Sequence, residues 1–203
     1  MKGFYFITDS SLSRAGNLSD VKDAVAAGVK VVQYRNKHAE TRQMLEEALK
    51  LKKICKNITL LINDRVDIAL ASNADGVHLG QYDMPLNVAR KILGKHKIIG
   101  VTVHNLAEAK TAREEGADYL GVSPIFATGT KKDAGKPAGV GLIKKIKKHI
   151  SIPVVGIGGI NLENAKEVIG AGADELCAIS AVVTKRNVKK EIEKFQKLFV
   201  KNK

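Results

Sequence analysis

Short apolar runs alternate along this chain with longer segments in which apolar residues recur every three or four positions. The apolar runs predict buried strands near residues 4–8, 30–34, 58–63, 75–79, 97–102, 118–123, 152–157 and 174–179. The longer segments predict helices near 17–27, 40–56, 65–72, 85–93, 105–115, 139–149, 161–171 and 187–200. Strands that alternate with helices favour parallel pairing, and eight such units predict a single α/β domain over 1–203, a closed (β/α)8 TIM barrel.

One short phrase recurs where a predicted helix gives way to a strand. It contains a small residue, Gly or Ala, then Asp or Val, and then the apolar run, as in segments 27–32, 73–78, 115–120 and 171–176. A glycine at this point is typical of a helix C-terminus. An open, doubly wound sheet is compatible with the same alternation, but a compact barrel fits the length of 203 residues better.

The formal net charge of +13 predicts an anionic partner, either a phosphorylated small molecule or a nucleic acid. The basic runs at 49–54, 144–148 and 189–203 alternate with apolar residues at helical spacing, which is typical of solvated helix faces. Aromatic residues make up only 4% of the chain, which is poor for stacking on bases. A small phosphorylated ligand is therefore favoured, and nucleic-acid binding is the weaker alternative.

The two cysteines, Cys55 and Cys177, lie far apart and have no metal-binding or redox spacing, so we expect buried thiols in a reducing compartment. The amino terminus lacks the apolar run of a signal peptide, and no apolar stretch approaches membrane-spanning length. These features predict a cytoplasmic protein that does not bind a membrane.

Polar residues follow every predicted strand, on the side where a barrel of this class places its active site. Asp64 and Asp83 follow the third and fourth strands, and a pair of carboxylates at one rim favours a hard divalent cation such as Mg²⁺. Arg35 and Lys37 follow the second strand. Asp64 alone would be typical of a helix cap, but carboxylates together with cations indicate a pyrophosphate site.

A second anion site is predicted after the last two strands. The glycine cluster at 156–160 precedes a predicted helix, and Ile179 and Ser180 follow the eighth strand, where these barrels commonly bind phosphate. The long connection 123–139 is rich in glycine and lysine and carries Thr128, Thr130 and Lys131. It could be an ordinary surface loop, but its position favours a mobile lid that closes over the substrate.

Seven short motifs, in order along the chain, resemble those of the thiamine phosphate synthase family. They are segments 32–37, 62–67, 74–81 with Asp83, 100–102, 124–131, 156–160 and 179–181. The resemblance covers residues from about 4 to 182. It implies a transferase that condenses hydroxymethylpyrimidine pyrophosphate with hydroxyethylthiazole phosphate, giving thiamine phosphate and pyrophosphate.

The resemblance also implies roles for individual residues. Mg²⁺ would bind Asp64 and Asp83, and catalysis would depend on Arg35, Lys37, Thr102 and Lys131. Barrels of this size often pair, so a homodimer is compatible with the sequence. The implied substrate contacts are Gln33, Tyr34, Arg35, Asn36, Lys37, Asn63, Thr102, Thr128, Gly129, Thr130, Lys131, Gly159, Ile179 and Ser180.

Two positions depart from the family pattern, and two other functions stay open. Asn36 replaces an acidic residue usual in the motif, and Thr102 replaces a common serine. A thiazole tautomerase-like relative would share the barrel, but it tends to lose the metal aspartates and to carry a histidine near Pro124. A non-catalytic phosphate-binding or RNA-binding barrel is the third possibility. His78 and His104 are expected to be bystanders or local hydrogen-bonding residues.

Overall fold

The computed structural model describes residues 2–130 and 135–200. Its strands form one closed barrel in which each strand pairs in parallel with the next, and β1 pairs with β8 through Gly3 and Glu175. This closure confirms the predicted barrel and excludes the open sheet. The strands are β1 (Gly3–Ile7), β2 (Val31–Tyr34), β3 (Thr59–Asn63), β4 (Gly76–Leu79), β5 (Ile98–Val103), β6 (Tyr119–Val122), β7 (Val154–Ile157) and β8 (Glu175–Cys177).

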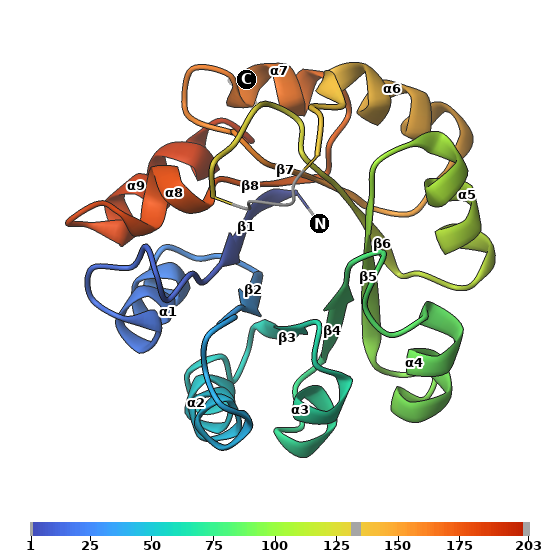
Figure 1. The fold of residues 1–203 in the computed structure, drawn as a ribbon. Helices are drawn as coiled ribbons and strands as arrows, with labels where there is room; N and C mark the ends of the chain where they lie inside the picture. Colours follow the sequence, from blue (N-terminus) through green and yellow to red (C-terminus); the bar gives the residue numbers. More distant parts are fainter. Residues whose placement is uncertain (1, 131–134, 201–203) are drawn as a thin grey trace.

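Helices surround the barrel as an outer layer (Figure 1). None of the helices within the described ranges is long and apolar enough to span a bilayer. Two details differ from the prediction. A short extra helix follows β8, and the helix expected at 161 begins at Ala165. The helices are α1 (Asn17–Ala26), α2 (Thr41–Ile54), α3 (Val66–Ala71), α4 (Leu86–Leu93), α5 (Leu106–Glu114), α6 (Gly139–His149), α7 (Ala165–Gly170), α8 (Ile179–Val183) and α9 (Val188–Lys197).

Each strand is buried on both faces because side chains alternate between the barrel interior and the layer beneath the helices. In β2, Val32 and Tyr34 join the large cluster that packs against the helices, while Val31 faces inward. The interior cluster is smaller and consists of Tyr5, Ile7, Val31, Leu61, Tyr119, Val155 and Cys177. The near-continuous apolar character of the strands in the sequence follows from this double burial.

The recurring phrase places an aspartate just before three of the even-numbered strands. Asp75, Asp118 and Asp174 each accept a hydrogen bond from a backbone N–H of the preceding strand, at Leu60 (2.8 Å), Ile99 (2.7 Å) and Val154 (2.9 Å) respectively. Each carboxylate also pairs with a cation on a neighbouring helix, namely Lys52, Arg90 or Lys147. In the first copy of the phrase, Lys30 occupies the equivalent position.

Removing one of these carboxylates is expected to weaken the barrel. Asp174→Ala leaves the Val154 N–H without its acceptor and should lower the free energy of unfolding by about 1–3 kcal/mol. Lys147→Ala removes only a partly exposed ion pair and should cost less than about 1 kcal/mol. Urea unfolding of both variants checks this order, and equal losses would contradict the role given to the backbone hydrogen bond.

Glu175 predicts a pH dependence of stability. Its side chain lies in β8 and is almost fully buried, and burial raises the pKa of its carboxyl from 4.5 to about 7. The folded state therefore holds this proton more tightly than the unfolded state, so the stabilisation is complete below pH 4.5 and is lost as the pH rises through 7. Glu175→Gln should be more stable than the parent at pH 8 by about 3 kcal/mol, and by much less at pH 5. Urea unfolding at both pH values tests this, and an equal difference at both would refute it.

Candidate active site

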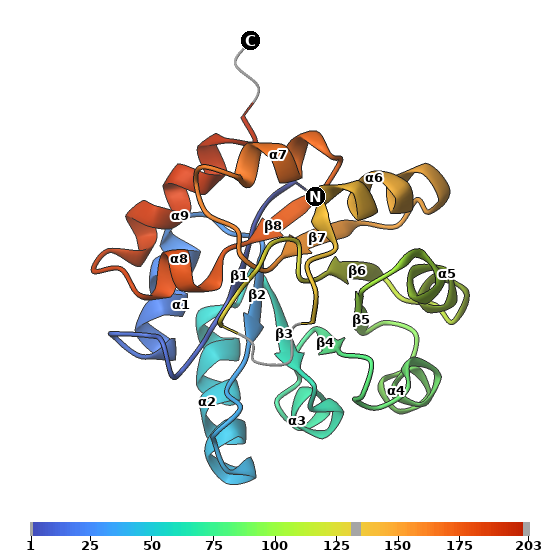
Figure 2. The same ribbon diagram turned by 45° about the horizontal axis from the view of Figure 1, so that its top comes forward.

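A cavity of about 270 Å³ opens at the carboxyl end of the barrel. All eight strands contribute to its wall through the residues at or just after their ends. The segment that follows β6, drawn in yellow in Figure 2, runs across one end of the barrel, and its residues Thr128 and Thr130 line the cavity. The predicted site residues that line the cavity are Gln33, Arg35, Lys37, Asn63, Asp64, Asp83, Thr102, Thr128, Thr130, Gly159, Ile179 and Ser180.

Three predicted contact residues do not line this cavity, and a fourth, Lys131, lies outside the described residues. The Tyr34 hydroxyl donates to Glu47 Oε2 at 2.5 Å beneath the helices, because Tyr34 alternates with the inward-facing Gln33. Asn36, in the loop after β2, accepts a hydrogen bond from the Ser10 hydroxyl at 2.8 Å. Gly129 lies between the two lining threonines but does not itself reach the cavity wall.

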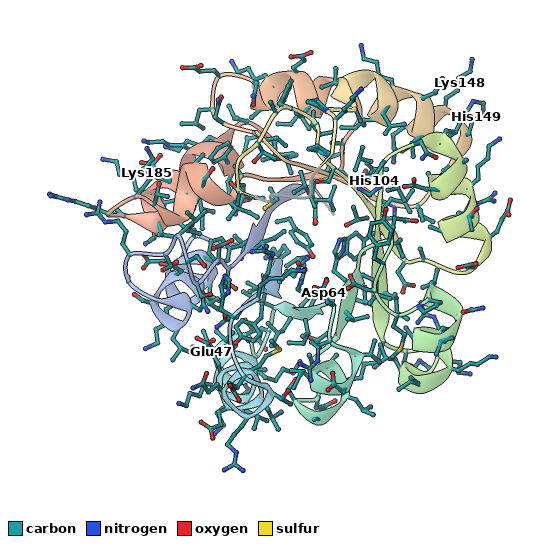
Figure 3. The ribbon with its side chains drawn as sticks, viewed as in Figure 1. Glu47, Asp64, His104, Lys148, His149 and Lys185 are labelled. Atoms are coloured by element: carbon teal, nitrogen blue, oxygen red, sulfur yellow. The ribbon has the colours of Figure 1, made fainter. Side chains whose placement is uncertain are left out.

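Asp64 and Asp83 come together at the rim, with their carboxyl groups within hydrogen-bonding distance of each other. Asp64 adopts a left-handed φ of 63°, and its N–H donates to the carbonyl of His78 at 2.8 Å. The Lys37 ammonium lies 2.7 Å from Asp64 Oδ2, and the Gly80 N–H donates to Asp83 Oδ2 at 2.6 Å. Figure 3 shows Asp64 toward the centre of the barrel, whereas Glu47 and Lys148 lie in the outer layer.

The two carboxyl groups differ in their affinity for a proton. Burial raises the pKa of Asp64, but its contacts with Lys37 and Asp83 outweigh this, and the net pKa is below the usual value. Burial and the neighbouring Asp64 carboxylate together raise the pKa of Asp83. The rim therefore holds one firmly ionised carboxylate beside one that is less acidic, an arrangement that a bound cation would stabilise.

Arg35 is fixed at the same rim by residues that follow β1. Its Nη1 donates to Asp9 Oδ2 at 2.6 Å, and the second Asp9 oxygen accepts from the N–H groups of Ser11 and Leu12. The Thr8 hydroxyl exchanges hydrogen bonds with the Arg35 backbone, at 2.8 and 3.0 Å. The guanidinium is thus held in place before any ligand binds, which reduces the ordering cost of binding an anion.

The opposite wall joins the loop after β6 to the glycines after β7. The N–H groups of Ile125 and Phe126 donate to the carbonyls of Ile157 and Gly158, at 2.8 and 3.0 Å. Gly159 has a φ of 66°, and a Cβ placed on it would lie 2.5 Å from the carbonyl oxygen of Ala127. The base of the predicted lid is therefore packed directly on the glycine turn.

The region after the last two strands, where a phosphate site was predicted, has different helix boundaries from those expected from the sequence. Residues 161–164 form a turn in which Asn161 Oδ1 accepts from the N–H groups of Glu163 and Asn164, so α7 begins only at Ala165. Residues 179–183 form α8, although residue 179 was predicted to be the last residue of the eighth strand. The cavity wall here consists of residues 157–160 and 177–180.

A chain of buried hydrogen bonds crosses the barrel interior beneath the cavity. Gln33 Nε2 donates to the Tyr5 hydroxyl, which bonds to the Tyr119 hydroxyl, each at 2.8 Å. Tyr119 bonds in turn to His78 Nδ1, and His78 Nε2 bonds to the Thr102 hydroxyl, again at 2.8 Å. His78 was expected to be a bystander or a local hydrogen-bonding residue. It lines the cavity, and its hydrogen bonds connect two predicted substrate contacts, Gln33 and Thr102.

The missed wall residues include His104 as well as His78. His104 Nδ1 lies 3.0 Å from Glu108 Oε2, and Glu108 also takes part in reciprocal hydrogen bonds with Asn105 at the start of α5. Side-chain alternation was the available signal for His78, because it lies between the apolar residues Val77 and Leu79, which pack against the helices, and so faces the barrel interior. No comparable pattern pointed to His104, which lies beyond the end of its strand.

The acidic pair fits a hard cation whose remaining coordination positions are filled by other ligands. Within residues 2–130 and 135–200, no group of three or more His, Cys, Asp or Glu side chains is arranged to hold a metal ion by itself. Mg²⁺ commonly binds one or two carboxylates and takes its remaining ligands from water and substrate phosphates. Asp64 and Asp83 supply carboxylates of this kind at a rim that also carries Lys37 and Arg35.

Together, the closed barrel and this rim define a (β/α)8 protein with a site suited to phosphorylated ligands. Residues 4–182 match the family model described as thiamine monophosphate synthase, and the chain belongs to that family. The thiamine-phosphate synthase of Methanosarcina mazei is 57% identical over 95% of this chain and 80% of its own length. That of Chloroflexus aurantiacus is 52% identical over 91% of this chain and 86% of its own.

A solved structure gives the same relationship. The thiamine phosphate pyrophosphorylase from Pyrococcus furiosus superimposes with a TM-score of 0.89 at 40% identity, covering 97% of this chain and 94% of that one. The recognised motifs and the three-dimensional fold therefore agree on the family.

Proposed function

We propose that this protein condenses hydroxymethylpyrimidine pyrophosphate with hydroxyethylthiazole phosphate to give thiamine phosphate and pyrophosphate. The observation that carries the proposal is one cavity that combines the Asp64–Asp83 pair with Lys37 and Arg35 on one side and the glycine turn on the other. The names of the relatives support the same reaction.

The pyrophosphate would occupy the rim with Arg35, Lys37 and the acidic pair. Asp64 and Asp83 would hold Mg²⁺, which supplies positive charge to the pyrophosphate oxygens when it is bound. Because Lys37 contacts Asp64 in the free protein, we expect its ammonium to turn toward the pyrophosphate as the site fills. Arg35, already fixed by Asp9, needs no such rearrangement.

The reaction requires the bond between the pyrimidine methylene and the pyrophosphate oxygen to break, with its electron pair leaving on the pyrophosphate. Arg35 and Lys37 would stabilise that developing negative charge, and Lys131 would join them from the loop after β6. The thiazole nitrogen then donates its lone pair to the methylene carbon. This sequence needs no covalent nucleophile and no general base in the protein.

The thiazole phosphate would bind on the opposite wall, at Thr128, Thr130, Gly159 and the start of α8. A methylene cation would react with water in an open site, so the loop over the cavity should also exclude solvent during turnover. The contact of this loop with the glycine turn supports a coupling between phosphate binding and lid position.

The test is to incubate the purified protein with both substrates and Mg²⁺ and to follow thiamine phosphate and pyrophosphate, with EDTA as the control. Formation of both products that stops on chelation supports the reaction and the metal requirement. Binding of both substrates without product would refute the proposal and favour a tautomerase-like or purely binding role. Product formation that is unaffected by EDTA would refute the metal assignment alone.

A further inference from the structure

Five buried polar side chains form an unbroken hydrogen-bonded chain across the barrel. Gln33, Tyr5, Tyr119, His78 and Thr102 come from five different strands, and none is more than 7% exposed. Each of the four contacts is 2.8 Å long. Burying so many polar groups is costly unless every donor meets an acceptor, so the direction of each hydrogen bond matters.

The direction of the whole chain follows from one end. The Gln33 Nε2 group donates to the Tyr5 hydroxyl, and the arrangement that leaves no buried donor unpaired gives the single Tyr5 hydrogen to Tyr119. The Tyr119 hydroxyl then donates to Nδ1 of His78. A ring nitrogen that accepts carries no proton, so the neutral His78 ring is protonated on Nε2 and donates to Thr102.

We infer that Tyr5, Tyr119 and His78 are positioning residues that fix the hydrogen-bonding direction of Gln33 and Thr102 at the cavity. With the chain in this order, Gln33 is left with its carbonyl oxygen to accept, and Thr102 is left with its hydroxyl hydrogen to donate. The cavity floor then presents one acceptor and one donor at fixed places. This pattern complements a heteroaromatic ring with an amino group near a ring nitrogen.

This inference rests on the proposed function for the identity of the ring, but the direction of the chain does not. The opposite direction would require the Gln33 amide to be turned over and His78 to be protonated on Nδ1. Thr102 would then present only lone pairs, and Gln33 would present only N–H groups. The tautomer of His78 therefore reports which pattern the cavity offers.

The experiment measures ¹⁵N chemical shifts of the histidine rings in the substrate-free protein, with the His78 signal assigned through its loss in His78→Gln. We expect the Nε2–H tautomer in the parent protein. Tyr119→Phe should convert it to a mixture, because Nδ1 loses its donor. Tyr5→Phe should leave the tautomer unchanged, because Tyr119 can still donate to His78. The Nδ1–H tautomer in the parent, or an unaltered tautomer in Tyr119→Phe, would overturn the inference.

Kinetics then connect the chain to the substrate. Tyr5→Phe and Tyr119→Phe should each raise KM for the pyrimidine substrate about tenfold and change KM for the thiazole substrate by less than about twofold. Ser72→Ala is the matched control, because it removes a buried hydroxyl hydrogen bond at the end of α3, away from the cavity. Equal changes for both substrates, or a similar change in Ser72→Ala, would show that the hydrogen-bonded side chains have only a structural role. Inactivity of the parent protein would instead refute the proposed function, while the tautomer measurement would still decide the direction of the chain.

Discussion

Asp64→Asn is expected to lower turnover at least about hundredfold at fixed Mg²⁺ and to raise the Mg²⁺ concentration needed for half-maximal activity. The amide keeps the size of the side chain, and asparagine tolerates the left-handed backbone that Asp64 adopts. The loss should therefore arise from charge and not from a change of fold. The variant also lacks the ion pair between Lys37 and Asp64, so the Lys37 side chain should no longer be held in its present position in the substrate-free protein.

A Mg²⁺ titration of steady-state activity provides the measurement, and Asp83→Asn should show a smaller change in the same direction. Asp83 is the less acidic member of the pair, and its amide replacement can still accept from the Gly80 N–H. Asp67→Asn is the matched control, because Asp67 pairs with Arg65 on the surface just after the same strand. A Mg²⁺ titration of Asp64→Asn that overlays the parent curve would show that Asp64 is only a turn residue.

The barrel could be predicted because its strands are buried on both faces and its helices on one, and these two patterns differ in the sequence. The failures occur where local sequence is ambiguous. The run from Ile179 to Val183 is short and rich in β-branched residues, so it resembles the end of a strand although it forms α8. Asn161 resembles a helix cap, but its side chain closes a separate turn before α7.

Much of the candidate site could be located from strand ends alone, because a parallel barrel brings them all to one rim. Tyr34 lies outside the cavity wall, and the sequence already indicated this, since a neighbour of inward-facing Gln33 must face outward. The partner of Arg35 could not be found in this way. Asp9 approaches it across two loops, and no periodic pattern in the sequence encodes that contact.

The polar chain in the barrel interior lies further from what sequence can reveal. Tyr5 and Tyr119 are 114 residues apart and lie on β1 and β6, which are not neighbouring strands. Each would be read in the sequence as an ordinary core aromatic. Only the closed geometry shows that their hydroxyls meet at the centre and that a histidine continues the chain.

Gly159→Ala is expected to reduce turnover about hundredfold, a loss typical of displacing a catalytic segment by about 1 Å. Gly159 has a φ of 66°, and its new methyl group would lie 2.5 Å from the Ala127 carbonyl oxygen and 2.8 Å from Phe126 Cβ. Neither the turn nor the base of the loop can absorb this clash without moving, because Phe126 is hydrogen-bonded to Gly158. Thr128 and Thr130 would therefore be displaced from the cavity wall.

Steady-state kinetics and thermal unfolding of the same variant separate this effect from a general loss of stability. Gly170→Ala is the matched control, since its Cβ would meet no atom within 4 Å and its backbone is helical. We expect KM for the thiazole substrate to rise with the fall in kcat, because the displaced loop and the glycine turn form the same wall. A Gly159→Ala protein that unfolds earlier but keeps parental kcat and KM would show that the turn supports the fold without shaping the phosphate site.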